Sequence, residues 1–220
     1  MGFYNKLILE KGLENMTEEI AGYLSFEESY IKDTISRSFF GKNPRILDVG
    51  CGNGRVLKLL EEICGEIHGI DFAKTQTREA KKNVLRSEII EGDAAQLPYK
   101  NQTFDCIICA YNTFGNIPDE KITVLKEMGR VLKEGGLGIV SVYAEEARSK
   151  QGEFYKSLGL EIEDETEDAI SLKEGLHSGR FTIDMFEGLF RAAGLRYENI
   201  TEVKIKDLRM AYICELKKIH

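Results

Sequence analysis

Three glycines and two acidic residues stand out in this chain because their types and spacing indicate chemistry. Gly50, Gly52 and Gly54 alternate with other residues directly after an apolar run that contains Asp48, and Asp71 ends the next apolar run. Glycines let the backbone approach a ligand closely, because no side chain stands in between. A carboxylate at the Asp71 position can accept hydrogen bonds from both vicinal hydroxyls of a ribose. The set predicts a site for a nucleoside cofactor.

Each acid also has an interpretation that needs no ligand. Asp71 stands where it can cap a helix that begins near Ala73. Asp48 can bind the amide groups of the glycine turn. The glycine spacing is GxGxG, whereas dinucleotide-binding proteins use GxGxxG. This difference weighs against a nucleotide-dependent oxidoreductase, which stays open as an alternative.

Strands and helices must alternate to position such a loop, and from residue 45 onward they do. This alternation is typical of βαβ units and a mostly parallel sheet, in which ligands bind at the carboxyl ends of the strands. We expect strands over 45–49, 66–70, 87–91, 104–111 and 137–143, and helices over 54–64 and 75–85. A further helix should open at Pro118 and stop at Gly135 and Gly136. Thr182 should cap the last helix, and strands over 196–203 and 209–216 should form a hairpin.

The length of 220 residues suits one α/β domain. Within it we expect four parts: an N-terminal helical lid over 1–40, a cofactor-binding core over 41–145, a substrate-covering insertion over 146–181, and a C-terminal helix and hairpin over 182–220. The insertion carries an acidic run over 161–168 and a glycine-containing turn over 175–179. It should form a helix followed by an irregular hairpin.

Composition narrows the class of protein. A net charge of -7 and a pI near 5.2 disfavour nucleic acid as a partner. No run approaches the roughly 20 apolar residues of a membrane span, and no signal-peptide core is found, so we expect a soluble, cytoplasmic protein. The five cysteines, an odd number, fit reduced thiols. Cys106 and Cys109 have CxxC spacing, but strand alternation sends them to opposite faces, so no metal or redox site is expected.

Five segments in order resemble the motifs of class I S-adenosylmethionine-dependent methyltransferases. Residues 46–55 resemble that family's D-x-G-x-G-x-G motif, and residues 67–72 resemble its second motif, an acid followed by an apolar residue. Residues 91–94 resemble the third motif, 104–108 the fourth strand, and 130–136 the turn before the fifth strand. The resemblance covers roughly residues 44–145. Within the family, the chain is most similar to the branches that act on small molecules.

The resemblance implies a Rossmann-like, doubly wound α/β fold with a seven-stranded, mostly parallel sheet and a C-terminal antiparallel hairpin. It implies S-adenosylmethionine as cofactor and S-adenosylhomocysteine as product. Asp71 would bind the ribose, Phe72 would pack on adenine, and Asp93 would meet the adenine amino group, although Phe72 can also be an ordinary core residue. The residues expected around the cofactor are Asp48, Gly50, Cys51, Gly52, Asp71, Phe72, Asp93, Ala94, Ala110, Tyr111 and Asn112.

The methyl acceptor should lie near the end of the fourth strand, where residues 111–116 are polar and aromatic. This segment does not match the N-P-P-Y form associated with methylation of adenine or glutamine amides, which favours a small molecule. The acceptor pocket is expected to involve Asn112, Asn116, Tyr143, His177 and Arg180. Loop asparagines that bind their own backbone and a solvated His177 are the alternatives.

Methyl transfer from a sulfonium is an in-line displacement on an activated donor, so positioning alone can supply on the order of 7–11 kcal/mol. The sequence assigns no general base and no oligomeric state. It predicts a methyltransferase that acts on a small molecule. The alternatives are a cofactor-binding regulatory protein without turnover and a methyltransferase that acts on a protein or transfer RNA.

Overall fold

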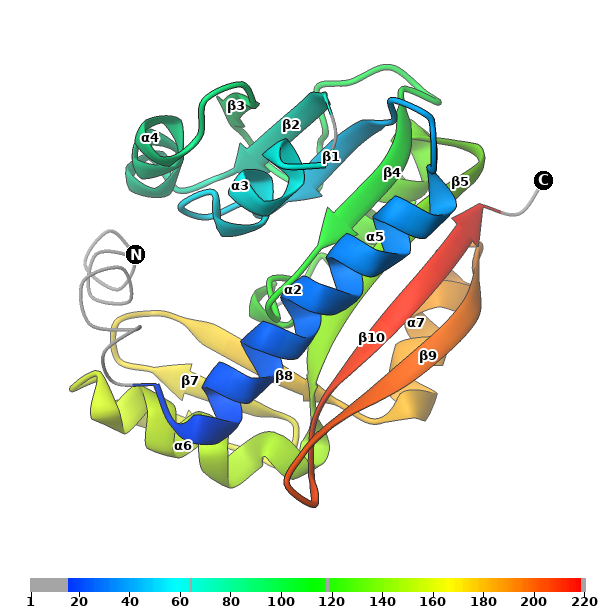
Figure 1. Cartoon of the computed structure of the whole chain (residues 1–220). Helices are drawn as coiled ribbons and strands as arrows, with labels where there is room; N and C mark the ends of the chain where they lie inside the picture. Colours follow the sequence, from blue (N-terminus) through cyan, green and yellow to red (C-terminus); the bar gives the residue numbers. More distant parts are fainter. Residues whose placement is uncertain (1–15, 64, 118, 219–220) are drawn as a thin grey trace.

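The computed structural model describes residues 16–63, 65–117 and 119–218. Its main sheet has five parallel strands in the spatial order β3 (Glu88–Glu91), β2 (Glu66–Asp71), β1 (Arg45–Val49), β4 (Phe104–Cys109) and β5 (Leu132–Ala144). The antiparallel strands β10 (Leu208–Lys218) and β9 (Leu195–Ile205) complete it (Figure 1). The predicted mostly parallel sheet with a C-terminal hairpin is therefore confirmed. Strand order reverses between β1 and β4, which brings the loops after these strands together.

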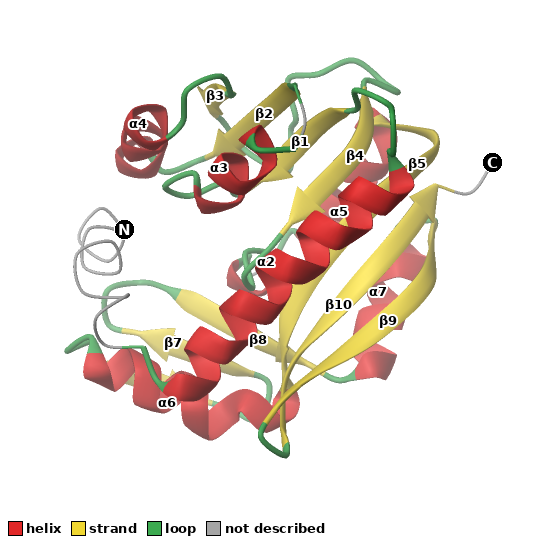
Figure 2. Cartoon of the chain, in the orientation of Figure 1, coloured by secondary structure: helices red, strands yellow, loops and turns green. Residues whose placement is uncertain are grey.

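Helices cover both faces of this sheet (Figure 2). One face carries α2 (Glu18–Ser38), α3 (Arg55–Glu61) and α6 (Arg148–Ser157), with α4 (Lys74–Asn83) beside α3. The other face carries α5 (Lys121–Val131) and α7 (Ile183–Ala192). Two apolar clusters fill these layers. We call them the α2-side and α7-side clusters.

The four described cysteines, Cys51, Cys106, Cys109 and Cys214, are buried and form no disulfide bond, and Cys64 lies outside the described residues. Cys106 belongs to the α2-side cluster and Cys109 to the α7-side cluster, as strand alternation predicts. In the described part of the chain, no group of three or more His, Cys, Asp or Glu residues is arranged to hold a metal. Likewise, none of the described helices is long and apolar enough to cross a membrane.

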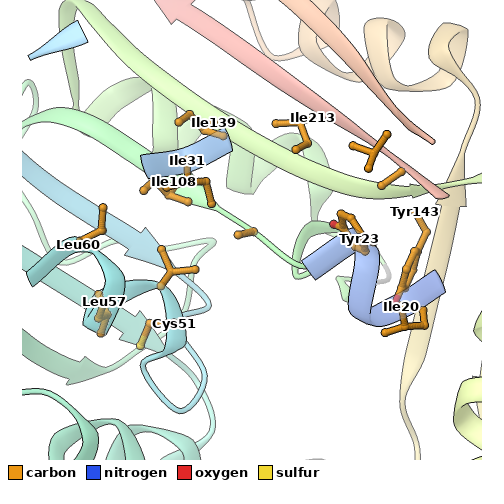
Figure 3. Packing of buried hydrophobic residues seen from close by; sticks show 14 of the residues in the cluster. Ile20, Tyr23, Ile31, Cys51, Leu57, Leu60, Ile108, Ile139, Tyr143 and Ile213 are labelled. Carbon is orange, nitrogen blue, oxygen red and sulfur yellow. The ribbon is translucent and has the colours of Figure 1, made fainter. Parts of the chain in front are cut away.

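Helix α2 packs as part of the core. Thr17 caps its start by accepting a hydrogen bond from the Ile20 amide at 3.3 Å. Ile20, Tyr23 and Ile31 are fully buried, and Figure 3 shows them beside residues of β4, β5 and β10. The predicted N-terminal lid is thus, over Glu18–Ser38, a core helix, because its apolar stripe covers the sheet. Residues 1–15 of that lid lie outside the described residues.

Two predicted boundaries are wrong. Strand β4 ends at Cys109 rather than at residue 111, because Tyr111 and Asn112 have positive φ angles of 51° and 55°. Helix α5 ends at Val131 and β5 starts at once, so the Gly135–Gly136 pair lies inside the strand rather than before it. There it coincides with a register shift between β4 and β5. Pro118, expected to open α5, lies outside the described residues.

The insertion forms a second small sheet beside the carboxyl end of β5. After α6, strands β6 (Ile162–Glu165), β7 (Ala169–Leu172) and β8 (His177–Phe181) run antiparallel, so the predicted hairpin has a third strand. Strand β8 pairs in parallel with β5 through Tyr143↔Arg180 and Ala144↔Phe181. The opposite edge of β5 is occupied by β10. Strand β8 therefore continues along the edge of β5 where β4 has ended.

Candidate functional site at the carboxyl edge of the sheet

The glycine loop joins β1 to α3 in a conformation that favours glycine. Gly50 and Gly52 have φ angles of 72° and 52°, in the left-handed region. A Cβ atom on Gly50 would lie 2.1 Å from Thr113 Cγ2, so this glycine lets the loop after β4 approach. At Gly52 the nearest atom to such a Cβ, Gln76 Oε1, is 4.0 Å away. Gly50 thus serves packing, whereas Gly52 faces open space.

Asp71, at the end of β2, fastens this loop to the start of α4. Its Oδ2 accepts a hydrogen bond from the Gly52 amide at 3.0 Å, and its Oδ1 accepts one from the Ala73 amide at 2.8 Å. The interpretation of Asp71 as the helix cap is wrong, because Ala73 is the N-cap of α4 and no side chain caps that helix; Asp71 binds the amide of the cap residue instead. Burial raises the pKa of Asp71, and these two amide bonds oppose that rise. Each carboxylate oxygen has a second lone pair, so these two amide bonds leave Asp71 able to accept a hydrogen bond from a ribose hydroxyl.

Asp48 is a buried carboxylate without a hydrogen bond to any described residue. Its side chain is 2% exposed and lies on the α2 side of β1. The loop amides bond elsewhere: Gly50 and Cys51 donate to Ile70 O at 2.7 and 3.1 Å. The interpretation that Asp48 caps these amides is therefore wrong. Burial raises its pKa to about 7, Arg55 opposes the rise, and Asp71 and Glu27 add to it.

The other residues predicted around the adenosine lie beside this loop and at the end of β3. Phe72 is 61% exposed, so it is not an ordinary core residue. Asp93 is exposed and accepts a hydrogen bond from the Ala95 amide at 2.8 Å, while Ala94 is half-buried. The Cys51 side chain is buried, and its sulfur would lie 2.9 Å from a Cβ on Gly69 of β2. Cys51 therefore offers a ligand its backbone only.

Asn112 uses its side chain for structure. It is buried, its Oδ1 accepts from the Tyr143 amide at 3.0 Å, and its Nδ2 donates to Ser178 Oγ at 3.0 Å and Gly179 O at 3.2 Å. The predicted contact of this side chain with an acceptor is therefore wrong. Asn116 is half-buried, with 3.4 Å between its Oδ1 and Asn112 Nδ2. These bonds join the loop after β4 to β5 and β8.

The remaining predicted acceptor residues do not converge. Tyr143 is buried on the α2 side, with its ring 5.7 Å from Tyr23 and 6.4 Å from Tyr111. His177 lines a hollow of about 570 Å³ between α7 and β7–β8, on the opposite side of the sheet. Burial and the nearby Lys121 lower the pKa of this histidine. The expectation that these residues form one pocket is wrong, because β8 separates the two sides.

Arg180 also borders that hollow, but its guanidinium is bound by the protein. It donates from Nη1 to Gln151 Oε1 at 2.6 Å, from Nη2 to the carbonyl oxygens of Thr166 and Ala169 at 2.5 and 3.2 Å, and from Nε to Glu167 O at 3.2 Å. Arg180 therefore holds the β6–β7 turn. Its predicted contact with an acceptor is replaced by this structural role.

A second polar cluster, not predicted from the sequence, surrounds the fully buried Glu27 of α2. Glu27 Oε1 accepts hydrogen bonds from the Tyr111 amide at 2.7 Å, from the Tyr23 hydroxyl at 3.0 Å and from Ser141 Oγ. Glu27 Oε2 pairs with Arg55 Nη2 at 2.7 Å. A sequence signal does exist, since Glu27 falls on the apolar stripe that Ile20, Tyr23, Leu24 and Ile31 define.

Comparison with known families identifies the core of this structure. A family model described as "Methyltransferase domain" matches residues 46–136. A demethylmenaquinone methyltransferase of Geobacillus sp. (strain WCH70) is 34% identical over 113 residues, which are 48% of this chain and 47% of that protein. The enzyme of the same name from Oceanobacillus iheyensis is 35% identical over 123 residues, 51% of each chain. The chain thus spans about half the length of the curated relatives it matches.

Solved structures share the fold over most of the chain. An S-adenosylmethionine-dependent methyltransferase from Clostridium acetobutylicum ATCC 824 has a TM-score of 0.70 at 15% identity and covers 98% of both chains. The PH0226 protein from Pyrococcus horikoshii OT3 has a TM-score of 0.71 at 23% identity, covering 90% of this chain and 91% of that one. The family model and the two named relatives favour a methyltransferase over the oxidoreductase that the glycine loop alone left open. Residues 46–136 of the chain therefore match a methyltransferase domain, and the described chain shares the fold of these solved structures.

Proposed function

We propose that this protein is an S-adenosylmethionine-dependent methyltransferase that methylates a small molecule by in-line displacement. The observation that carries the proposal is the Asp48 carboxylate, which is buried and accepts no hydrogen bond from any described residue. An uncompensated buried charge is costly, and a cationic ligand beside it lowers that cost. S-adenosylmethionine carries a sulfonium and an ammonium group, and when bound it supplies an activated methyl group.

The residues at this edge of the sheet fit the rest of that cofactor. Asp71 keeps free lone pairs for the ribose hydroxyls after it has bound two amides. The exposed Phe72 ring directly follows it and suits stacking on adenine, with Asp93 and Ala94 beside the base. The backbone of Gly50, Cys51 and Gly52, and that of residues 110–112, would bind the methionine part.

Catalysis in this proposal comes from orientation. In this proposal the cofactor lies between the loops after β1 and β4, and Tyr111 belongs to the second of these loops. Burial raises the pKa of Tyr111, so its phenol stays protonated at neutral pH. We therefore assign no general base to it. Alignment of nucleophile, methyl carbon and sulfur can supply on the order of 7–11 kcal/mol without one.

A small-molecule acceptor is supported by the named relatives and by composition. Two relatives are named demethylmenaquinone methyltransferases. A structural neighbour from Burkholderia thailandensis, with a TM-score of 0.64 at 16% identity, is a 1,6-didemethyltoxoflavin-N1-methyltransferase. The net charge of -7 also weighs against nucleic acid as acceptor. We propose a cytoplasmic location on the same basis.

Calorimetry with S-adenosylmethionine and S-adenosylhomocysteine tests the cofactor assignment. Asp71→Ala should weaken binding of both by about tenfold or more, because it removes the ribose acceptor and loosens the loop at Gly52. Asp207→Ala, on the exposed turn between β9 and β10, is the matched control and should bind like the wild type. An Asp71→Ala variant that binds both compounds as tightly as the wild type would contradict the assignment of Asp71 to the cofactor site.

A turnover assay separates the alternatives. The protein is incubated with S-adenosylmethionine and with three fractions of a cell extract: metabolites, proteins and transfer RNA. Formation of S-adenosylhomocysteine is then measured. Turnover in the metabolite fraction supports the proposal, and turnover confined to either macromolecular fraction contradicts the small-molecule acceptor. Cofactor binding without turnover in any fraction would instead support a regulatory protein.

A further inference from the structure

Two consecutive residues in the loop after β4 have a backbone conformation that disfavours side chains. Tyr111 and Asn112 lie in the left-handed region, which asparagine can adopt but which costs free energy for a tyrosine. The other non-glycine residues described with positive φ, Gln102 and Lys206, are exposed and lie in turns. The Tyr111–Asn112 pair also lies in a turn, but this turn follows the central strand β4 and is not exposed. Such a conformation persists only where its surroundings hold it.

Glu27 holds Tyr111 at two points. Its Oε1 accepts the hydrogen bond of the Tyr111 amide at 2.7 Å. Its Oε2 pairs with Arg55, whose guanidinium lies over the Tyr111 ring at 5.5 Å from the centroid. Ser141 of β5 supports the first contact, since its Oγ accepts from the Tyr111 amide at 2.9 Å and donates to Glu27. One buried carboxylate thus controls both the backbone and the ring of Tyr111.

The same carboxylate also sets the charge near Asp48. Arg55 opposes the rise in the pKa of Asp48, so its position affects how readily that acid ionises. Glu27 and Glu28 both fix Arg55, through bonds of 2.7 and 2.8 Å. Only Glu27 also reaches Tyr111, and it does so from α2, 84 residues earlier in the chain. A helix outside the family-matched region therefore reaches the loops on both sides of the proposed cofactor.

We propose that Glu27 is a positioning residue for methyl transfer. It holds the Tyr111–Asn112 segment in its left-handed conformation and orients the Tyr111 ring through Arg55. Glu27 itself does not touch the reacting atoms. The inference rests on the proposed function, because it takes the loop after β4 as one wall of the cofactor site.

The test compares Glu27→Gln with Glu28→Gln. Both variants remove a carboxylate that pairs with Arg55, but the Glu28 side chain is 40% exposed, and it is Glu27 that accepts the Tyr111 amide. With S-adenosylhomocysteine as the probe, calorimetry should give a Kd about tenfold higher for Glu27→Gln. Glu28→Gln should stay within about twofold of the wild type, as expected for an exposed ion pair.

A spectroscopic readout distinguishes positioning from a general loss of stability. In protein labelled with ¹⁵N-tyrosine, Tyr111→Phe identifies the Tyr111 amide among the nine tyrosines. A strong hydrogen bond to a carboxylate should shift this amide proton downfield. Glu27→Gln should move the signal, and Glu28→Gln should leave it in place. Ser141→Ala removes the second acceptor of the same amide. It should also move the Tyr111 signal and should raise the Kd for S-adenosylhomocysteine about threefold.

The outcomes separate the two proposals. If wild-type protein does not bind S-adenosylhomocysteine, the proposed function fails. If the wild type binds but Glu27→Gln has the same Kd and an unmoved Tyr111 amide, the positioning role of Glu27 is overturned while the proposed function stands. If Glu27→Gln does not fold, Ser141→Ala decides: an unmoved Tyr111 signal with wild-type affinity overturns the inference, and a moved signal with weaker binding supports it.

Discussion

Replacing Asp48 with asparagine should stabilise the ligand-free protein and weaken cofactor binding. Burial raises the pKa of Asp48 from 3.8 to about 7 in the folded protein. The folded state therefore binds more protons than the unfolded state between these values, and ionisation of Asp48 lowers the free energy of unfolding as the pH rises through this window. Above pH 7 the penalty is constant, and below pH 3.8 it is absent.

The size of the effect follows from the same pKa difference. A change from 3.8 to about 7 corresponds to about 4 kcal/mol, at 1.36 kcal/mol per pKa unit. With Asp48 only 2% exposed, solvent screening removes little of it. The buried amide of asparagine also lacks partners, which costs about 1–3 kcal/mol. We therefore expect a net gain of about 1–3 kcal/mol at pH 8, and no gain at pH 3.5.

Two measurements check this prediction. Urea unfolding followed by circular dichroism gives the free energy of unfolding of wild type and Asp48→Asn at both pH values, with the exposed Asp207→Asn as control. Calorimetry at pH 8 should show S-adenosylmethionine binding about tenfold or more weaker in Asp48→Asn, because the attraction between the carboxylate and the sulfonium charge is lost. The affinity for S-adenosylhomocysteine, which has no sulfonium charge, should fall by a smaller factor. Equal stability of variant and wild type at pH 8, together with equal affinity, would refute the reasoning.

The affinity of the wild type should also depend on pH. Since Asp48 ionises near pH 7, S-adenosylmethionine should bind more tightly at pH 8 than at pH 6. Asp48→Asn should bind with the same affinity at both values. A parallel pH dependence in wild type and variant, measured by calorimetry, would assign the effect to another group.

Three further substitutions test the structural roles. Gly50→Ala should lower the free energy of unfolding by about 1–3 kcal/mol, because Gly50 has a positive φ angle and its new methyl group would meet Thr113. Adding Thr113→Ser to this variant should restore part of the lost stability in the same urea titration. Asn112→Ala should cost about 1–3 kcal/mol and increase amide hydrogen exchange in β8, because it leaves the Tyr143 amide without its acceptor and removes the bonds from Asn112 to Ser178 and Gly179. His177→Ala should leave the calorimetric Kd for S-adenosylhomocysteine within about twofold of wild type, whereas a tenfold loss would place the α7-side hollow in the cofactor site.

Local sequence patterns determined the frame of this protein. The spacing of apolar residues predicted the bounds of β1 through β4 to within a few residues. A strand or helix buries one face, and the apolar residues of that face recur at a spacing that is visible in the sequence. The glycine loop, Asp48 and Asp71 were found because a turn from strand to helix near a ligand restricts residue types over a short distance. The Thr182 cap and the final hairpin were predicted for the same reason.

Tertiary structure alone decided which side chains meet. Asn112 finds its partner Ser178 across 66 residues, and Glu27 finds Tyr111 across 84, distances at which no periodicity specifies a pairing. The left-handed Tyr111 is a tyrosine, so no glycine marked that turn in the sequence. Strand β8 joins β5 beyond the end of β4 and so divides Tyr143 from His177. The sequence by itself therefore determined the glycine loop and its sheet, because these depend on neighbouring residues. The packing of α2 and β8 decided which side chains surround the loop after β4, because those contacts exist only once the sheet has formed.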